Sequence, residues 1–306
     1  MNKGANFLVS VIIPNYNCAE FLPRAIESVV QQTFSRWEII IIDNYSTDES
    51  DAVIKNYLND RIHLLKVNNN GVIAASRNLG VKNAKGKWIA FLDADDWWMN
   101  DKLEASINFI DESKADIVYH DLYLVGKSKK ILLWQRTWGA DISKDSWTHL
   151  FYDGNVLSNS SVVVRKSALE KIGYLSEDRD CISWEDFDTW LRLAKGNFKF
   201  RKLNGIYGYY WIGGGNISNP EQHLKNINSF TLKYVEEKNK IPWWCYYIRG
   251  TAFKELKKYD ESISNFRLVL ANTSSLMIKL KSIIRIIQIF LTITSSFCQT
   301  NLSSAP

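Results

Sequence analysis

The sequence predicts an α/β protein with a mostly parallel, doubly wound sheet followed by a helical extension. Short apolar segments rich in β-branched residues alternate with amphipathic helical patterns over the first 120 residues, as in a chain of β-α-β units. From residue 221 onward the pattern is helical, and a glycine-rich stretch at 213–219 precedes it. We therefore expect two domains, over 1–219 and 220–306, a division that suits a chain of 306 residues.

Each early element follows from its local pattern. Residues 9–13 are apolar except for one serine, and Pro14 follows them. This pattern predicts a buried strand. Residues 19–32 carry apolar side chains at helical spacing. The same two patterns predict further strands at 37–42, 62–67, 88–92 and 116–119, and further helices at 48–59, 72–83 and 100–111.

The segment from 120 to 212 is less regular. Its patterns predict strands at 122–126, 131–134, 198–203 and 206–212, an apolar run at 162–164 and a helix at 185–195. The glycines that follow either cradle phosphate with their backbone N–H groups or form a mobile lid, and the sequence leaves both readings open.

Composition excludes several classes of protein. Hydrophobic residues make up 46% and charged residues 23% of the chain, as in ordinary globular proteins. The four cysteines lie far apart, which excludes a disulfide framework and a zinc ribbon and favours a reducing compartment. We expect no secretory signal and no transmembrane helix.

Polar clusters follow the first, second and fourth predicted strands, and a further cluster opens the third helix. They are 14–17, 43–48, 70–80 and 93–96. Because ligands bind at the carboxyl ends of the strands in such sheets, we expect these clusters to line one rim.

Asp93 and Asp95 are the sharpest candidates for a metal site. They stand two residues apart directly after a buried strand, and carboxylates in such a loop suit Mg²⁺ or Mn²⁺. The alternative is a solvated acidic turn.

Three other positions each allow a functional and a structural interpretation. Asp43 either accepts a hydrogen bond from a uracil base or caps the next helix. Arg77 either reaches a phosphate or lies on a helix surface. Asp186, beside Glu185, either acts as a general base or interacts with the dipole of the helix that it opens.

Taken together, the motifs resemble those of family 2 glycosyltransferases, over roughly residues 8–215. The motifs are VSVIIPNYN (9–17), IDNYSTD (42–48), ASRNLG (75–80), FLDADD (91–96) and WED (184–186). The resemblance implies a GT-A fold, a nucleotide-sugar donor that is usually UDP-linked, and Mn²⁺ or Mg²⁺ as cofactor. It also implies an inverting transfer in bacterial surface polysaccharide synthesis, such as that of O-antigen or capsule.

The resemblance also assigns roles to residues. Asp186 would be the catalytic base with Glu185 beside it, and Asp95 would lie by the metal. Asp43 would contact the nucleobase, and Tyr45 would add an aromatic face there. The other residues expected at the nucleotide are Pro14, Tyr16, Arg77, Asn78, Asp93 and Ala94.

The C-terminal part contains two predicted features. Residues 245–272 resemble a single tetratricopeptide repeat, with packing positions at Gly250, Ala252, Leu256, Tyr259, Ile263 and Phe266. Residues 276–293 form a basic amphipathic helix whose polar side carries Lys281, Ser282, Arg285, Gln288 and Thr292. The apolar side of this helix either lies in a membrane interface or packs against the preceding hairpin.

The charge distribution favours the membrane. Residues 220–306 contain twelve Lys or Arg against six Asp or Glu, and no acidic residue follows Glu261. We expect a cytoplasmic enzyme, peripheral at the inner face of the membrane, that elongates a glycan carried on a polyprenyl diphosphate. The alternative is a non-catalytic nucleotide-binding or scaffold protein that recruits partners through its C-terminal helices. A nucleic-acid partner is disfavoured, because the excess charge lies on an isoleucine-rich helix.

Overall fold

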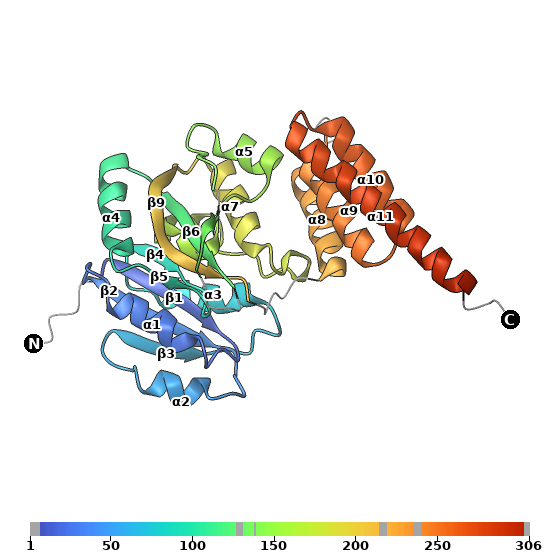
Figure 1. Ribbon diagram of the computed structural model, residues 1–306. Coiled ribbons are helices and arrows are strands. Elements are labelled where there is room, and N and C mark those ends of the chain that lie inside the picture. Colours follow the sequence, from blue (N-terminus) through green and yellow to red (C-terminus); the bar gives the residue numbers. More distant parts are fainter. Residues whose placement is uncertain (1–6, 127–130, 138, 214–218, 236–239, 303–306) are drawn as a thin grey trace, which may run out of the picture. The chain divides into compact units, whose positions relative to one another are not determined.

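The computed structural model describes residues 7–126, 131–137, 139–213, 219–235 and 240–302 (Figure 1). Contacts divide the chain into two compact units. The first comprises Met1–Leu150 and Asn155–Gly215, and the second comprises Phe151–Gly154 and Asn216–Pro306. Each unit is described by itself below.

The first half of the sheet is parallel. Its strands occur in the order β3-β2-β1-β4, with all three pairings parallel. Their bounds are β1 Val9–Asn15, β2 Trp37–Asp43, β3 Ile62–Lys66 and β4 Trp88–Phe91. Every residue of β1 and β2 is buried, as expected for parallel strands covered on both faces. The helices that connect them are α1 Leu22–Val30, α2 Ser50–Lys55 and α3 Ile73–Asn83.

The second half of the sheet is mixed, so the sheet is less parallel than predicted. Beyond β4 the order continues β8-β6-β9-β5, with β7 on β6. Their bounds are β5 Trp97–Trp98, β6 Ile117–Val125, β7 Ile131–Arg136, β8 Val163–Arg165 and β9 Phe200–Trp211. The three-residue β8 lies antiparallel between β4 and β6. The α/β class is confirmed, but an apolar run carries no information about strand direction.

One long strand replaces the two predicted at 198–203 and 206–212. β9 runs through both, and the register of its parallel pairing with β6 shifts between Tyr119 and Asp121. Gly205 lies inside β9 with φ +124°, a conformation that side chains rarely adopt. The gap between the two predicted strands is therefore an irregularity within one continuous strand.

Four further helices belong wholly or mainly to the first unit. They are α4 Lys102–Ser113, α5 Ser146–Asp153, α6 Lys166–Lys171 and α7 Glu185–Lys195, with short 3₁₀ turns at Asn159–Ser161 and Arg179–Cys181. The bounds of α7 are those predicted. Its acidic first turn, basic last turn and amphipathic pattern all favour those ends.

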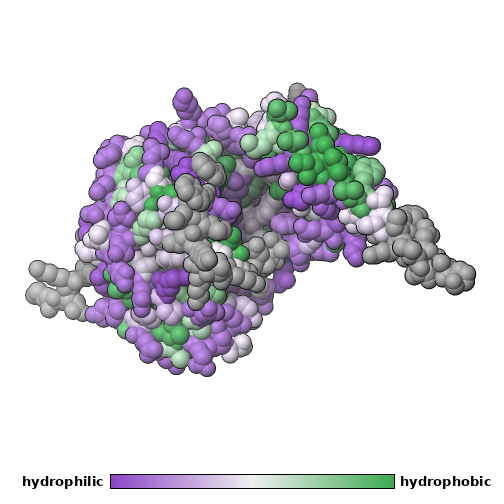
Figure 2. All heavy atoms as spheres, viewed as in Figure 1, coloured by the Kyte–Doolittle hydropathy of each residue, from purple (hydrophilic) through white to green (hydrophobic). Residues whose placement is uncertain are grey.

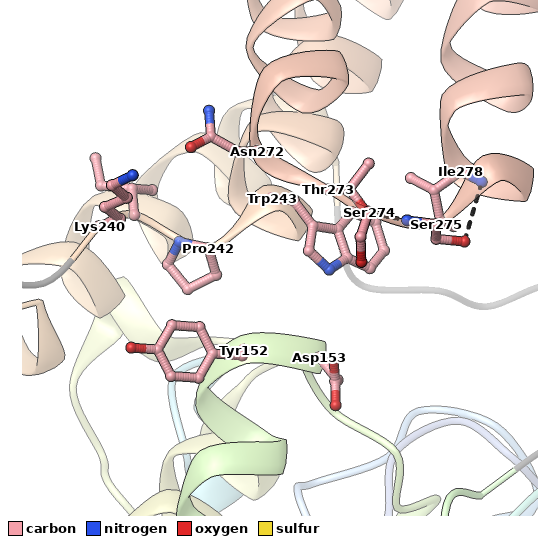
Figure 3. A pocket seen from close by; sticks show the side chains of 11 residues that line it. Tyr152, Asp153, Lys240, Pro242, Trp243, Asn272, Thr273, Ser274, Ser275 and Ile278 are labelled. Carbon is pink, nitrogen blue, oxygen red and sulfur yellow. Dashed lines mark hydrogen bonds between the residues drawn. The ribbon is translucent and has the colours of Figure 1, made fainter.

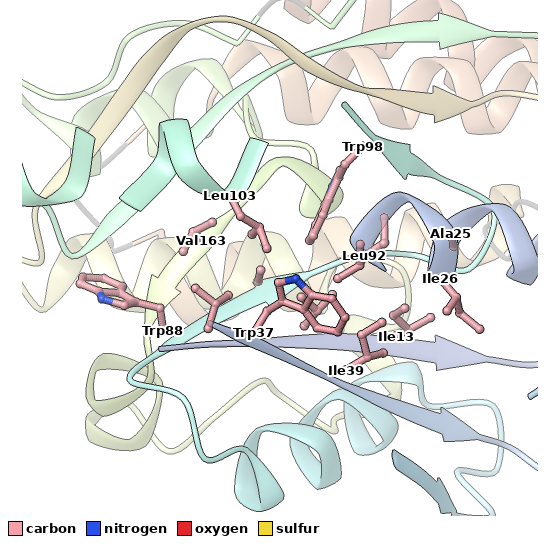
Figure 4. Packing of buried hydrophobic residues seen from close by; sticks show 14 of the residues in the cluster. Ile13, Ala25, Ile26, Trp37, Ile39, Trp88, Leu92, Trp98, Leu103 and Val163 are labelled. Carbon is pink, nitrogen blue, oxygen red and sulfur yellow. The ribbon is translucent and has the colours of Figure 1, made fainter. Parts of the chain in front are cut away.

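The main core lies between the sheet and its covering helices. Figure 4 shows Trp37, Trp88 and Trp98 among aliphatic side chains from β1, α1 and α4. All three tryptophans are buried. Indole rings bury large apolar areas, so this cluster contributes much of the stability of the sheet that carries the strand ends.

The second unit is helical. Its helices are α8 Pro220–Tyr234, α9 Trp243–Glu255, α10 Tyr259–Asn272 and α11 Leu276–Leu302. α9 packs closely on α10: a Cβ at Gly250 would lie 3.0 Å from the Phe266 ring, and the Ser262 hydroxyl donates to the Gly250 carbonyl at 2.6 Å. The helical hairpin is therefore present, whereas its resemblance to a tetratricopeptide repeat stays a prediction. Among the described residues, no helix is both long and apolar enough to cross a bilayer.

Candidate active site

The ends of β1 and β2 hold the predicted nucleobase residue. Asp43 ends β2 beside Asn15 of β1 and is 1% exposed. Its Oδ1 accepts from Asn15 Nδ2 at 2.9 Å and from Ser46 Oγ at 2.6 Å, and its Oδ2 accepts from Ser46 N at 3.1 Å. The carboxylate therefore fixes the turn after β2. Pro14 lies inside β1, because the strand continues past it to Asn15.

Two exposed aromatic rings flank this turn. Tyr16 follows β1 and is 57% exposed, and Tyr45 follows β2 and is 60% exposed. The backbone of Tyr45 is left-handed, with φ +52°. Asn17 holds the two loops together, since its side-chain oxygen accepts from Thr47 N at 2.8 Å. The rings are thus displayed next to Asp43 by an ordered pair of loops.

Arg77 is the centre of a buried ion-pair network. It lies in α3, is 3% exposed, and donates from Nη2 to Asp93 Oδ1 at 2.6 Å and from Nη1 to Glu185 Oε1. The Asn159 amide oxygen, turned toward the guanidinium, accepts from the same Nη2 at 3.1 Å. Burial alone would lower the pKa of Arg77, but the two carboxylates raise it above its usual value. Arg77 is therefore no surface helix arginine.

Asn78 faces away from this network, toward the segment before α7. Its Nδ2 donates to the Leu175 carbonyl at 2.9 Å and to Glu177 Oε1 at 2.8 Å, and its Oδ1 accepts from Leu175 N at 3.0 Å. These bonds tie α3 to the chain that leads into α7. In the structure, Asn78 therefore positions the segment that leads into α7.

The loop after β4 gathers three carboxylates. Ala94 is buried between Asp93 and Asp95, and Asp96 is buried behind them. Burial, and then the nearby Asp93, raise the pKa of Asp95 to about 6. The pKa of Asp96 is raised well above its usual value, first by burial and then by Asp95. Negative charge is thus crowded at this loop.

Asp186 lies at the N-terminus of α7, next to the network. Its Oδ1 accepts from Phe187 N at 2.6 Å, and its Oδ2 lies 3.4 Å from Asn155 Nδ2. Burial, and then the neighbouring Glu185, raise the pKa of Asp186 to about 7, although Arg77 opposes this shift. Glu185 is buried, and its Oε2 has no hydrogen-bond partner among the described residues. Asp186 is therefore poised to accept a proton near neutral pH.

Several residues near these groups were not predicted. Asn159 contacts Arg77, and Ser160 Oγ accepts from Asp93 N at 3.1 Å. Arg24 donates to the Asp95 carbonyl at 2.9 Å and stacks on Trp97, 3.5 Å from the ring centroid. An open groove of about 690 Å³ lies beside Arg24 and Trp97. None of these residues belongs to one of the motifs, and no pattern in the sequence marked them as part of the site.

A second pocket lies within the helical unit. It has a volume of about 430 Å³, and Figure 3 shows Tyr152, Pro242 and Trp243 around it, with Asn272 and Ser275 at its upper side. None of the carboxylates predicted for catalysis lines it. Of the three glycines predicted to cradle phosphate or form a lid, Gly213 is described, whereas Gly214 and Gly215 lie outside the described residues.

A family model described as glycosyl transferase family 2 matches residues 10–173. The chain belongs to this family. The match contains the strand-end loops and Arg77, whereas Glu185 and Asp186 lie beyond it. The protein is therefore a glycosyltransferase, and the alternative of a non-catalytic scaffold is not needed.

Individual proteins agree with the family. The WfaP protein of Escherichia coli, a UDP-Glc:alpha-D-GlcNAc-diphosphoundecaprenol beta-1,3-glucosyltransferase, is 30% identical over 211 residues, covering 69% of this chain and 80% of that protein. Among solved structures, S. aureus TarS 1–349 in complex with UDP-GlcNAc superposes with a TM-score of 0.64 and 18% identity, covering 96% of this chain and 92% of that one. A mannosyltransferase from Pyrobaculum calidifontis, in complex with GDP-Man and Mn²⁺, superposes with a TM-score of 0.55 and 14% identity. The superposition covers 95% of this chain and 80% of that one. These structures support the GT-A fold.

Proposed function

We propose that this glycosyltransferase moves a sugar from a UDP-sugar to a hydroxyl of a lipid-linked surface glycan, with inversion at the anomeric carbon. The activity of WfaP, a UDP-Glc:alpha-D-GlcNAc-diphosphoundecaprenol beta-1,3-glucosyltransferase, supports both the donor and the acceptor class. The UDP-GlcNAc bound to TarS supports the same donor class.

The observation that carries the proposal is the Arg77 ion-pair network. Arg77 binds Asp93 on the loop after β4 and Glu185 at the start of α7. It thereby fixes the proposed donor loop against the helix that carries Asp186. A transfer that proceeds by direct displacement needs the base and the donor held in one geometry, and a buried network of charged hydrogen bonds provides this rigidity.

In the proposed reaction Asp186 removes the proton from the acceptor hydroxyl as its oxygen attacks the anomeric carbon. The bond from that carbon to the UDP oxygen breaks on the opposite face, and the electron pair leaves with the diphosphate. One base suffices, because the diphosphate departs without protonation by a strong acid. This differs from glycosidases, which use paired carboxylates.

The proposed nucleotide site lies over the ends of β1, β2 and β4. Tyr16 and Tyr45 have exposed rings on which a uracil can stack. Asp43, beneath them, would accept from the base, and Asp93 would lie near the ribose. Pro14, Asn78 and Ala94 would shape the site through the backbone they position.

We propose that Asp95 would hold a divalent cation together with the phosphates of the donor, since no group of three or more metal-ligating side chains is found in the described part of the chain. The carboxylate of Asp95 is half-buried beside other carboxylates, and burial, followed by the nearby Asp93, raises its pKa to about 6 although Arg24 opposes the shift. Mg²⁺ and Mn²⁺ usually bind through one or two carboxylates together with substrate phosphates. When bound, such a cation neutralises charge on the leaving diphosphate. The Mn²⁺ in the Pyrobaculum mannosyltransferase structure supports this assignment.

We further propose that the enzyme works at the cytoplasmic face of the membrane as a peripheral protein. Its acceptor carrier would be a lipid, and the excess basic charge of the C-terminal part suits an anionic surface. Nucleic acid is not proposed as a partner.

The test is the Asp186→Asn variant of the full chain, assayed with UDP-sugars and a polyprenyl-diphosphate-linked monosaccharide. We expect transfer to fall by a factor of at least about 10² while UDP affinity changes little, because the amide is isosteric but accepts no proton. Asp180→Asn, at an exposed acid outside the network, serves as the control. A folded Asp186→Asn variant that has lost UDP binding, or that keeps full activity, would contradict the assigned role.

A further inference from the structure

Helix α11 turns a defined side toward the rest of its unit. Ser282 and Ile289 are fully buried there. Ile289 packs in a cluster with Ile263 and Phe266 of α10, and Ile286 lies against the same cluster. This inward side includes Ser282, which the sequence placed on the polar side of the helix. The inward contacts therefore use a different set of residues from the predicted apolar side.

The opposite side of α11 is apolar and exposed. Eight residues there are between 43% and 80% exposed: Leu276, Met277, Leu280, Ile283, Ile284, Ile287, Phe290 and Leu291. At 100° per residue they share one broad side of the helix. In Figure 2 hydrophobic residues gather over the C-terminal helices. We call these eight residues the α11 outer face. The structure thus excludes the alternative in which the predicted apolar side packs against the hairpin.

Basic side chains border the outer face. By the same helical geometry, Lys281 lies next to one edge and Lys279 next to the other, and Arg285 lies beyond Lys281, toward the inward side. No acidic residue follows Glu261, so nothing on α11 offsets these charges. An apolar face with cationic borders is the arrangement of helices that lie in the interface of an anionic bilayer.

We propose that the α11 outer face docks on the surface of an anionic lipid bilayer, with the helix axis in the plane of the interface. A second copy of this chain fits less well, because a two-fold contact through this face would place the basic borders of two α11 helices next to each other. The inference deepens the membrane location proposed above. The docking of α11 on a bilayer does not depend on the acceptor, and it would stand even if the acceptor were not linked to a lipid.

The experiment is flotation of the full-length protein with phosphatidylcholine vesicles, with and without phosphatidylglycerol. We expect binding to the anionic vesicles that weakens with added salt. Ile287→Glu, at the centre of the outer face, should lower the partition coefficient at least about tenfold. Lys281→Gln should lower it about fivefold, as expected for one charge near an anionic surface.

The matched control is Leu232→Glu, which places the same change on α8 at a leucine that is 87% exposed. It should bind vesicles as the wild type does. Equal binding by Ile287→Glu, or no binding by the wild type, would overturn the proposal. The proposal would also be overturned if the wild type formed a dimer that does not bind vesicles and that dissociates in the Ile287→Glu variant. UDP binding, measured in parallel, should be unchanged in every variant, so that a failure here is distinct from a failure of the proposed transfer.

Discussion

At the scale of single residues, the site depends on how Arg77 pairs with two of three neighbouring acids. Arg77 forms direct ion pairs with Asp93 and Glu185. Asp186 stands next to Glu185 without a direct ion pair to Arg77, and its pKa is raised to about 7, first by burial and then by Glu185. The Asp186 carboxyl therefore titrates near neutral pH, as the proposed role of a general base requires.

This arrangement predicts a pH dependence. Only ionised Asp186 accepts a proton, so kcat/KM should rise with pH and level off above about 7. Glu185→Gln keeps an oxygen for Arg77 but removes the negative charge that raises the pKa of Asp186. The midpoint of the rise should therefore move to lower pH. The measurement is kcat/KM from about pH 5 to about pH 9, with Asp180→Asn as a control. A midpoint that stays in place or moves upward would show that Glu185 does not set this pKa.

At the scale of elements, the position of Arg77 depends on how closely α3 lies on the sheet. A Cβ at Gly80, one turn along α3 from Arg77, would lie 2.7 Å from side-chain carbons of Ile12 in β1 and Ile42 in β2. Both isoleucines are buried, so they have little room to move. Glycine at this position therefore sets the distance between helix and sheet.

Gly80→Val should accordingly lower the free energy of unfolding by about 1–3 kcal/mol, the usual cost of overpacking. Activity should fall as well, because α3 carries Arg77. Urea denaturation measures the first effect. Gly126→Val is the control, since a Cβ there meets nothing within 4 Å. Equal destabilisation by both substitutions would show that the tight contact at Gly80 is not the cause of the loss of stability.

Local patterns predicted most elements, and the exceptions have identifiable causes. The bounds of α7 follow from its own residues, so they were found correctly. The direction of β8 depends on which strands flank it, and three residues carry no such information. Two strands were predicted at 198–203 and 206–212, yet β9 pairs with the long strand β6 on both sides of Gly205 and is continuous.

The candidate site shows the same limit. The motifs located Asp43 and Asp93 because acidic residues after apolar runs are visible in the sequence, and Asp186 because an acidic turn opens an amphipathic helix. They did not show that Arg77 binds Glu185, which lies 108 positions away. They also did not predict the contact between Asn159 and Arg77, because the segment around Asn159 shows no helical or strand periodicity of apolar residues. Partnerships between distant segments require the tertiary structure.

At the scale of the whole molecule, charge is divided between the two parts of the chain. The chain carries a net charge of +5, whereas residues 220–306 alone contain twelve basic and six acidic residues. The remainder is therefore close to neutral and slightly acidic. The acidic loop at Asp93–Asp96 suits a metal-bound diphosphate, and the basic helices suit an anionic surface. The two proposed partners of the enzyme thus call for opposite charges, and the chain supplies them in separate segments.

Donor binding should be visible in the stability of the whole enzyme. A ligand at about 100 times its Kd that binds only the native state stabilises it by about 2.7 kcal/mol. UDP with Mn²⁺ should therefore raise the unfolding midpoint, and EDTA should remove most of the rise. Below about pH 6 the rise should shrink, because Asp95 then holds a proton in place of the cation.

Asp95→Ala should lose the Mn²⁺-dependent part of this rise and keep any part that UDP produces alone. Asp60→Ala, at an exposed acid, should behave as the wild type. A rise of equal size with Mn²⁺ and with EDTA in the wild type would show that no cation takes part in binding the diphosphate. In that event the positive charge would have to come from the protein, and Arg24, which already contacts the Asp95 carbonyl, would be the cation to substitute next.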